Sequence, residues 1–341
     1  MADGEQAGAP RRVALDVMGG DNAPGEIVAG AVQAAREQGI GVWLVGPEPV
    51  IRDELAKYDT TGLDLPIKHT VDVIGMDEHP AEAVRARPNN TISVCHQLVR
   101  DGEALGAVSA GNSGACLAAA IFTLRRIKGV ERPALGTVLP AAGGQKTLLL
   151  DVGANTDSKP SYLLQFALMG SAYMRSAFAV AAPRVGLLAN GEEETKGDQL
   201  VQEAHQLIKA SVASTGLNFI GNVEGRDINA GTVDVVVCDG FVGNVALKLS
   251  EGLSKMLLAT IRQELTSGPL TAAGALLAKP AFDRVRRQLD YQEYGGAPLL
   301  GVAGVSIVAH GRSTAKAIAS AVRVATQVAD AHLPAMITES M

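Results

Sequence analysis

The chain has 341 residues, of which 47% are hydrophobic and 19% charged. This composition supplies a folded core and excludes a disordered protein. The net charge of −6 argues against nucleic acid as a partner, because binding to backbone phosphates requires a basic face. Three cysteines without paired spacing, Cys95, Cys116 and Cys238, indicate a reducing cytoplasm and neither a disulfide framework nor a zinc site.

Short apolar runs alternate with helix-length stretches along the first part of the chain. Residues 1–10 are expected to form a flexible tail before one folded unit over residues 11–335. Strands are predicted over residues 13–16, 42–46, 67–71 and 107–109, and helices over residues 25–38, 91–101 and 115–124. Strands that alternate with helices predict an α/β fold, with a mostly parallel sheet and helices on both of its faces.

Two apolar runs break this alternation. Residues 136–139 and 147–151 are separated by a turn at 143–145, which predicts an antiparallel hairpin. We therefore expect a second subdomain that begins near residue 130, with a cleft between the two subdomains.

A long helical projection is predicted over about residues 244–289, where leucines and methionine form a broad apolar stripe. One interpretation is a pair of helices that forms a homodimer. The other is an apolar tip, rimmed by Lys279 and Arg284, that contacts a membrane surface or an acidic carrier protein. Both contacts are compatible in one dimer.

Six of the apolar runs end in a small, polar, glycine-rich corner before the next helix-length stretch. The corners are LDVMGGDNAPG, SAGNSGA, LDVGANTD, LLANGEEETKG, VCDGFVGN and VAHGRS. Ligands bind at the carboxyl ends of parallel strands, because backbone N–H groups and helix dipoles converge there. Five corners carry Asn and one carries Lys196, which predicts an enzyme with an anion site.

Several familiar motifs are missing from the sequence. The first corner lacks the G-x-G-x-x-G spacing of a dinucleotide site, and no P-loop, H-E-x-x-H or G-x-S-x-G sequence occurs. We therefore expect no cofactor and no metal. A site without a standard nucleophile suits a reaction in which the substrate, such as inorganic phosphate, is itself the nucleophile.

The motifs LDVMGGD, SAGNSGA, ERPALGTVLP, LDVGANTD, GEEETKG, CDGFVGNVALK, YGGAPLLG and HGRS occur in the order typical of one family. On these motifs the chain resembles the bacterial phosphate acyltransferases. The resemblance implies transfer of a fatty acyl group from acyl carrier protein to inorganic phosphate, giving acyl phosphate for phospholipid synthesis.

The same resemblance implies a fold like the isocitrate and isopropylmalate dehydrogenases and phosphotransacetylase. It also implies a homodimer in the cytoplasm, associated peripherally with the inner membrane face, near the downstream glycerol-phosphate acyltransferase. Two alternatives stay open: a phosphotransacetylase-like enzyme that uses acyl-coenzyme A, and a non-enzymatic binding protein that senses membranes.

The predicted catalytic residues are Lys196, Asp16, Asn22 and His310. The resemblance places Lys196, expected at a helix start, in the catalytic motif, where it binds phosphate or the oxyanion. The alternative for Lys196 is an ion pair with Glu192. His310 protonates the leaving thiolate or binds phosphate, or is a satisfied residue at a strand end.

Substrate-binding residues are predicted at the same corners. Asp21 orients Lys196 or an amide, or else caps the following helix. Turn chemistry alone is the alternative explanation for Asn190 and Asn244. The full predicted substrate-binding set is Gly19, Gly20, Asp21, Gly111, Asn112, Ser113, Asn155, Asn190 and Asn244. Cys116 is not predicted as a nucleophile, because no activating His is adjacent in sequence.

Overall fold

The computed structural model describes residues 11–289 and 295–341, which divide into two compact units. The described part of unit 1 comprises residues 11–133, 172–181 and 295–341, and that of unit 2 comprises residues 134–171 and 182–289. The tail expected over residues 1–10 lies outside the described residues. Among the helices of the described ranges, none is long and apolar enough to cross a membrane.

Unit 1 is an α/β unit whose elements come from both ends of the chain. Its strands are β1 (Arg12–Asp16), β2 (Gly41–Gly46), β3 (Ile67–His69), β4 (Ala107–Ser109), β10 (Ala297–Leu300) and β11 (Ser306–Val308). Its helices are α1 (Gly25–Gln38), α2 (Glu48–Leu55), α3 (Pro80–Ala86), α4 (Thr91–Arg100), α5 (Ser113–Thr123), α10 (Ala315–Asp330) and α11 (Leu333–Ser340).

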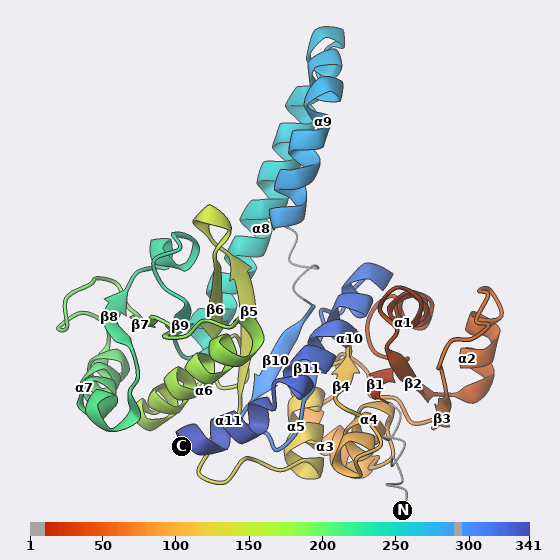
Figure 1. Cartoon of the computed structure of the whole chain (residues 1–341), viewed down its shortest axis with the longest axis horizontal. Coiled ribbons are helices and arrows are strands. Elements are labelled where there is room, and N and C mark those ends of the chain that lie inside the picture. The colour runs from red at the N-terminus through yellow and green to blue at the C-terminus, as the bar shows by residue number, and fades with distance from the viewer. Residues whose placement is uncertain (1–10, 290–294) are drawn as a thin grey trace, which may run out of the picture. The chain divides into compact units, whose positions relative to one another are not determined.

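The strands of unit 1 lie in the order β3-β2-β1-β4-β11-β10. All neighbours are parallel except β10, which is antiparallel to β11. Helices α1 and α10 cover one face of this sheet, and α3, α4 and α5 cover the other (Figure 1). The successive residues Val13, Ala14 and Leu15 of β1 are all fully buried, as expected for a strand covered on both faces.

The strand order in unit 1 reverses between β1 and β4. The chain leaves β1 through α1 toward β2, whereas β4 lies on the other side of β1 and is reached through α3 and α4. Such a switch point opens a crevice at the carboxyl ends of the two strands, where α/β proteins bind ligands. The corners after β1 and β4 therefore lie at the place where a ligand is expected.

Unit 2 is a second α/β unit. Its strands are β5 (Ala134–Pro140), β6 (Lys146–Leu150), β7 (Val185–Leu188), β8 (Phe219–Val223) and β9 (Val235–Val237). Its helices are α6 (Pro160–Phe178), whose residues from Ala172 onward belong to unit 1, α7 (Gln199–Thr215), α8 (Gly240–Leu265) and α9 (Pro269–Leu289), with 3-10 turns at Ala142–Gly144 and Gly225–Asn229.

The strands of unit 2 lie in the order β5-β6-β9-β7-β8. The pair β5 and β6 is antiparallel, which confirms the hairpin predicted from the sequence, and the other pairs are parallel. Gly143 and Gly144 at the hairpin turn have φ values of 68° and 73°, a conformation that glycine adopts without strain. With unit 1, this arrangement confirms an α/β fold built on a mostly parallel sheet.

The helical stretch expected over residues 244–289 consists of two helices, α8 and α9, that run side by side (Figure 1). The most exposed apolar side chains along α8, at 49–68%, are Phe241, Val245, Leu249, Leu253, Met256 and Leu257. On α9, Leu270, Leu276 and Leu277 are 72–87% exposed. So large an exposed apolar surface marks an interaction site.

Close packing of α1 on α10 supplies a test of the unit 1 core. A Cβ atom on Gly30 would lie 2.5 Å from Ile318 Cβ and 2.7 Å from the Ala315 carbonyl oxygen. We expect Gly30→Ala to lower the free energy of unfolding by about 1–3 kcal/mol, although Ala favours the helical state. Denaturant unfolding measures the change. Gly252→Ala on α8 is the control, since nothing lies within 4 Å of its Cβ position. Equal effects at both positions would contradict this account.

Candidate active site

Three corners of unit 1 contact one another at the carboxyl ends of the adjacent strands β1, β4 and β11. The backbone N–H of Asp21 donates to the Gly311 carbonyl at 2.7 Å. A Cβ on Gly20 would lie 2.9 Å from the same Gly311 oxygen and 3.2 Å from Ala110 Cβ. Gly20 also has a φ of 101°, so both space and backbone conformation require glycine there. The predicted residues Gly19, Gly20 and Gly111 therefore belong to one tightly packed cluster.

Asp16 organises this cluster from inside. Its carboxylate accepts hydrogen bonds from Ser109 Oγ at 2.7 Å and from the Met18 N–H at 3.1 Å. Ser109 Oγ in turn accepts from the Gly111 N–H at 3.0 Å, so Asp16 is linked to the second corner through the Ser109 hydroxyl. Burial raises the pKa of the Asp16 carboxyl, and the hydrogen bond from Ser109 opposes this rise. With 1% of its surface exposed, Asp16 is placed to position neighbours.

Asn112 is held inside the second corner. Its Oδ1 caps α5 by accepting from the Ala115 N–H at 3.1 Å, and its Nδ2 donates to the carbonyls of Met76 and Glu78 at 3.1 and 3.3 Å. Ser113, the first residue of α5, is exposed. Asn112 thus fixes the helix N-terminus and a neighbouring loop, while the Ser113 hydroxyl faces solvent.

Exposed polar side chains form the rim of the unit 1 corners. Asn22 Nδ2 donates to the Ser313 carbonyl at 3.3 Å, and Asp21 Oδ2 lies 3.7 Å from Arg312 Nε. Helix α1 has no side-chain cap, so the alternative interpretation of Asp21 as its cap is wrong. The side chain of Arg312 at this rim is 78% exposed. Arg312 was not among the predicted site residues, although it belongs to the predicted HGRS corner.

His310 is half-buried at the end of β11. Its Nδ1 accepts a hydrogen bond from the Arg312 N–H at 3.2 Å, so the neutral imidazole carries its proton on Nε2. That Nε2–H is a donor suited to a phosphate oxygen or to a leaving sulfur. Its position at a corner of the cluster is compatible with either predicted role.

In unit 2 the predicted LDVGANTD corner is built on Asp151, a residue that was not among the predicted site residues. The fully buried Asp151 carboxylate accepts hydrogen bonds from the backbone N–H groups of Leu135, Gly153, Ala154 and Asn155 at 2.7–3.1 Å. It also accepts from Asn155 Nδ2 at 2.9 Å. Burial raises the pKa of Asp151, and these donors oppose the rise. The predicted residue Asn155 is therefore held by Asp151.

An open, polar pocket of about 450 Å³ lies beside this corner in unit 2. It is lined by Thr156, Asp157, Ser158, Asp198, Leu200, Asp239, Phe241 and Val242. Asp198 caps α7 by accepting from the Val201 N–H, and Asp239 caps α8 by accepting from the N–H groups of Phe241 and Val242. Asn244 lies one turn into α8, is exposed, and has its Cβ and Cγ 3.9 Å from the Cβ position of Gly153.

Lys196 lies in an exposed loop and not, as predicted, at a helix start. Helix α7 begins at Gln199 because Gly197 has a φ of 92°, which helices exclude, and Asp198 caps the next turn. Asn190 Oδ1 accepts from the Gly197 N–H at 2.8 Å and so fixes the end of this loop. Glu192 pairs with Arg226 and not with Lys196, so the alternative interpretation of Lys196 is wrong. Within the described residues Lys196 has no ion-pair partner.

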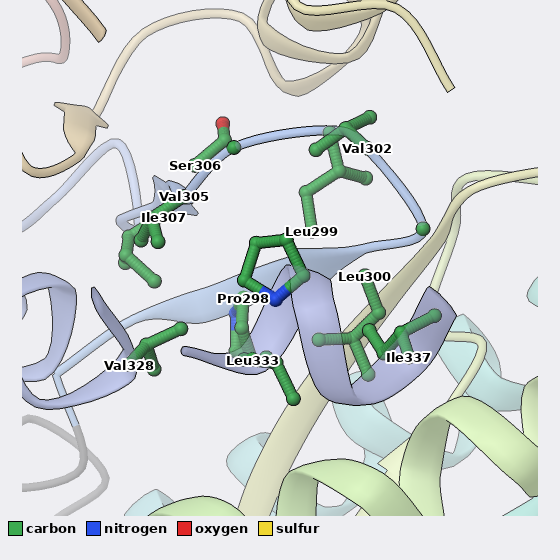
Figure 2. Close-up of a pocket in the computed structure, with 13 residues that line it drawn as sticks. Pro298, Leu299, Leu300, Val302, Val305, Ser306, Ile307, Val328, Leu333 and Ile337 are labelled. Atoms are coloured by element: carbon green, nitrogen blue, oxygen red, sulfur yellow. The ribbon is translucent and has the colours of Figure 1, made fainter. Parts of the chain in front are cut away.

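Two further features bear on the chemistry of unit 1. Cys116 is buried, and burial raises the pKa of its thiol to about 12, which opposes a role as a nucleophile. A second cavity, between β10, β11, α10 and α11, is lined by apolar side chains such as Leu333 and Ile337 (Figure 2). It offers only about 10 Å³, the room of a single water molecule, so it holds neither phosphate nor an acyl chain.

No group of three or more His, Cys, Asp or Glu side chains within residues 11–289 and 295–341 is placed to hold a metal ion. What the corners offer is backbone N–H groups, amides and two exposed cations, Lys196 and Arg312. This chemistry suits an anion and the charge that develops on a carbonyl oxygen.

Within unit 1 the structure brings the predicted residues of three corners together. Within unit 2 it brings Asn155 close to the start of α8, and it places Asn190 on the Lys196 loop.

Comparison with known proteins identifies the fold and then the family. A phosphotransacetylase from Streptococcus pyogenes matches with a TM-score of 0.65 over 95% of each chain at 16% identity, so the chain has a phosphotransacetylase-like α/β fold. A family model described as "Fatty acid synthesis protein" matches residues 11–336. The chain is 48% identical to the phosphate acyltransferase of Trichlorobacter lovleyi over 97% of this chain and 94% of that protein.

It is also 52% identical to the phosphate acyltransferase of Nitratidesulfovibrio vulgaris, over 92% of this chain and 90% of that protein. The chain belongs to the phosphate acyltransferase family. The resemblance drawn from the eight sequence motifs is thereby confirmed.

The buried Asp16 carboxyl predicts a pH dependence of stability. Because its pKa is raised above 3.8 in the folded state, the folded protein binds this proton more tightly than the unfolded chain. The free energy of unfolding therefore falls as the pH rises from about 4 through the folded pKa. Asp16→Asn has no proton to lose, so its stability relative to wild type should rise over this interval. Urea unfolding at a series of pH values measures it.

Ser109→Ala is the matched variant for this test. It keeps the carboxyl but removes a hydrogen bond that lowers the pKa of Asp16, so the loss of stability with rising pH should grow. A stability difference between Asp16→Asn and wild type that is constant with pH would contradict the raised pKa.

Proposed function

We propose that this protein transfers a fatty acyl group from the thioester of acyl carrier protein to inorganic phosphate, giving acyl phosphate for phospholipid synthesis. The observation that carries this proposal is the 48–52% identity, over nearly the whole chain, to proteins named phosphate acyltransferase. That identity supports both the acyl group and the phosphate acceptor. The carrier-protein donor is our own inference.

The reaction needs no nucleophile from the protein. A phosphate oxygen attacks the thioester carbonyl carbon, a C–O bond forms, and the C–S bond breaks. Dihydrogen phosphate supplies the proton that the leaving thiolate takes up, so the products are acyl phosphate and the free carrier thiol. The protein has to hold phosphate and to stabilise the oxyanion of the transition state.

The residues divide these tasks by their position. We assign phosphate binding to the corner amides around Gly111 and Ser113 at the N-terminus of α5, where the helix dipole favours an anion. Lys196 neutralises the phosphate or the oxyanion. His310 donates from Nε2 to phosphate or to the leaving sulfur. Asp16 and Asn22 hold the corners in place.

We further propose a cleft between the two units, as in the isocitrate and isopropylmalate dehydrogenases. The support is chemical: the corners of unit 1 supply amides and Arg312, whereas unit 2 supplies Lys196 and Asn244. The amides to which we assign phosphate are in unit 1, and the lysine to which we assign phosphate or the oxyanion is in unit 2, so the proposed reaction needs both units.

Two exposed cations on α9, Lys279 and Arg284, favour an acidic protein as the donor. The phosphotransacetylase-like fold keeps acyl-coenzyme A as the second candidate donor. Rates with the two thioesters separate them. A preference for the carrier protein that weakens with salt supports our proposal, and equal rates contradict it. A purely membrane-sensing protein would release no carrier thiol on addition of phosphate.

The exposed apolar surface of α8 and α9 supports two contacts. We assign the stripe through Leu249 and Leu253 to a second copy of the chain, giving a homodimer. We assign Leu270 and Leu277 to the inner face of the membrane, so that a cytoplasmic protein associates with it peripherally. The downstream glycerol-phosphate acyltransferase would then receive acyl phosphate at the membrane.

Lys196→Ala tests the proposed catalytic cation. Loss of a charge that stabilises the transition state should lower kcat/KM for phosphate by about 10²–10³-fold without unfolding the protein. Phosphate-dependent release of carrier thiol measures turnover, and thermal unfolding checks the fold. Cys116→Ala is the control and should keep near-normal turnover, because the buried thiol takes no part. Near-normal turnover of Lys196→Ala, or loss of turnover in Cys116→Ala, would exclude this mechanism.

Exposed leucines on α9 provide a test of membrane contact. Leu270→Glu combined with Leu277→Glu should weaken binding to vesicles of anionic phospholipid by about 100-fold or more, since burial of each leucine contributes roughly 1.5–3 kcal/mol. Co-sedimentation with the vesicles measures binding. Gln263→Glu on α8 adds negative charge without removing apolar surface and serves as the control. Vesicle binding that falls equally in the control would assign the effect to charge alone.

A further inference from the structure

Two buried polar side chains lie next to each other at the edge of unit 2. His205 on α7 and Asn222 on β8 are 2% and 6% exposed. His205 Nδ1 lies 2.8 Å from Asn222 Oδ1, and the His205 ring packs edge-on against Phe219 at a centroid distance of 5.2 Å. Burial of polar groups costs stability unless their hydrogen bonds are made. A polar pair in this position therefore needs an explanation beyond packing.

A bulge in β8 creates the pair. Val185 of β7 is opposite Phe219, but the next residue, Gly186, is opposite Gly221, so β8 carries one extra residue. Side chains three residues apart in a regular strand point to opposite faces. The bulge, with Gly221 at a φ of 95°, turns Asn222 to the same face as Phe219, toward His205. Bulges of this kind re-aim side chains next to active sites.

Asn222 connects this pair to the loop that carries Lys196. Asn222 Nδ2 donates to the Glu193 carbonyl at 2.8 Å, and the backbone N–H of Lys196 donates to the same oxygen at 2.9 Å. Because a carbonyl only accepts, the amide nitrogen of Asn222 must face Glu193 and its oxygen must face His205. The oxygen also only accepts, so His205 carries a proton on Nδ1. The hydrogen bonds therefore run in one direction, from His205 to Asn222 and from Asn222 to the Glu193 carbonyl.

Further contacts hold the other end of the loop. Asn190 Oδ1 accepts from the Gly197 N–H at 2.8 Å, and Gln202 Nε2 donates to the carbonyls of Thr195 and Gly197 at 3.0 Å each. Backbone groups on both sides of Lys196 are thus fixed, while its side chain is exposed.

We infer that His205 and Asn222 are positioning residues, which hold residues 190–197 so that the Lys196 ammonium group stays in one place during acyl transfer. This inference rests on the proposed role of Lys196 in binding phosphate or the oxyanion. His205 fixes Asn222, Asn222 fixes the Glu193 carbonyl, and that carbonyl fixes the backbone of Lys196. Neither side chain touches substrate.

Four variants separate this role from simple packing. Asn222→Asp keeps the shape and the acceptor toward His205 but removes the donor to Glu193. His205→Leu removes the donor to Asn222. His205→Asn restores it, because its amide nitrogen lies as many bonds from Cβ as Nδ1 does. Phe219→Leu, the matched control, removes a ring contact with His205 but no hydrogen bond.

Limited trypsin digestion measures how readily the loop opens, since trypsin cleaves after lysine and Lys196 is exposed. Asn222→Asp and His205→Leu should be cleaved after Lys196 about tenfold faster, because loss of a buried hydrogen bond raises the open population of the loop. Cleavage after Lys57 in unit 1 should not change. In Asn222→Asp and His205→Leu, kcat/KM for phosphate should fall about tenfold, while KM for the acyl donor should not change. His205→Asn and Phe219→Leu should match wild type in both assays.

Three results would overturn the inference. Unchanged cleavage after Lys196 in Asn222→Asp and His205→Leu would show that the pair does not hold the loop. Equal acceleration after Lys57 would show global destabilisation instead. Faster cleavage after Lys196 with full turnover would show that the loop is held for another reason. A wild-type protein without phosphate-dependent thiol release would refute the proposed function, whereas the digestion pattern would still decide whether the pair holds the loop.

Discussion

Each unit depends on one buried aspartate at the carboxyl end of a strand. Asp16 is the last residue of β1 and Asp151 directly follows β6, both in a Leu-Asp-Val triplet, and both are at most 1% exposed. Each carboxylate accepts the backbone N–H two residues further on, Met18 or Gly153, at 3.1 Å. A buried charge is stable only when such donors surround it, so the chain must turn sharply where the strand ends. This constraint gives both corners their geometry without help from a ligand.

The same constraint divides the predicted site residues into two groups. Asp16 and Asn112 form their hydrogen bonds inside the protein. Asp16 bonds to Ser109, and Asn112 bonds to the α5 N-terminus and to the loop at Met76. Residues at the rim, among them Asp21 and Ser113, remain exposed. Inner residues therefore set the positions of backbone N–H groups, and in the proposed site the rim residues contact the ligand. A substitution inside should disturb geometry, whereas one at the rim should disturb recognition.

Much of the fold followed from the sequence, because an apolar run that ends in glycines has few alternatives to a strand and a turn. The hairpin of β5 and β6 and the parallel pairing are of this kind. The helix start at Lys196 was wrong, since an acid-rich segment resembles a first helical turn and nothing local reveals the positive φ of Gly197. Asp151 could have been singled out, because most of its donors lie within four residues and its Leu-Asp-Val triplet repeats that of Asp16. The role of Asn222, in contrast, depends on partners far along the chain, and the bulge in β8 depends on pairing with β7. No pattern within one segment carries that information.

The proposed binding of an anion at Lys196 has to be reconciled with the acidic residues around it. Three glutamates, residues 192–194, precede this lysine, and unpaired they would weaken its field. Glu192 instead pairs with Arg226, and Glu194 pairs with Lys209 on α7. These cations neutralise two of the three charges and also tie the loop to the body of unit 2. Cys116 is buried and its thiol pKa is raised to about 12, which favours phosphate over this thiol as the nucleophile of the proposed reaction. In that reaction a fixed cation and fixed amides suffice, because the protein has to supply only position and charge.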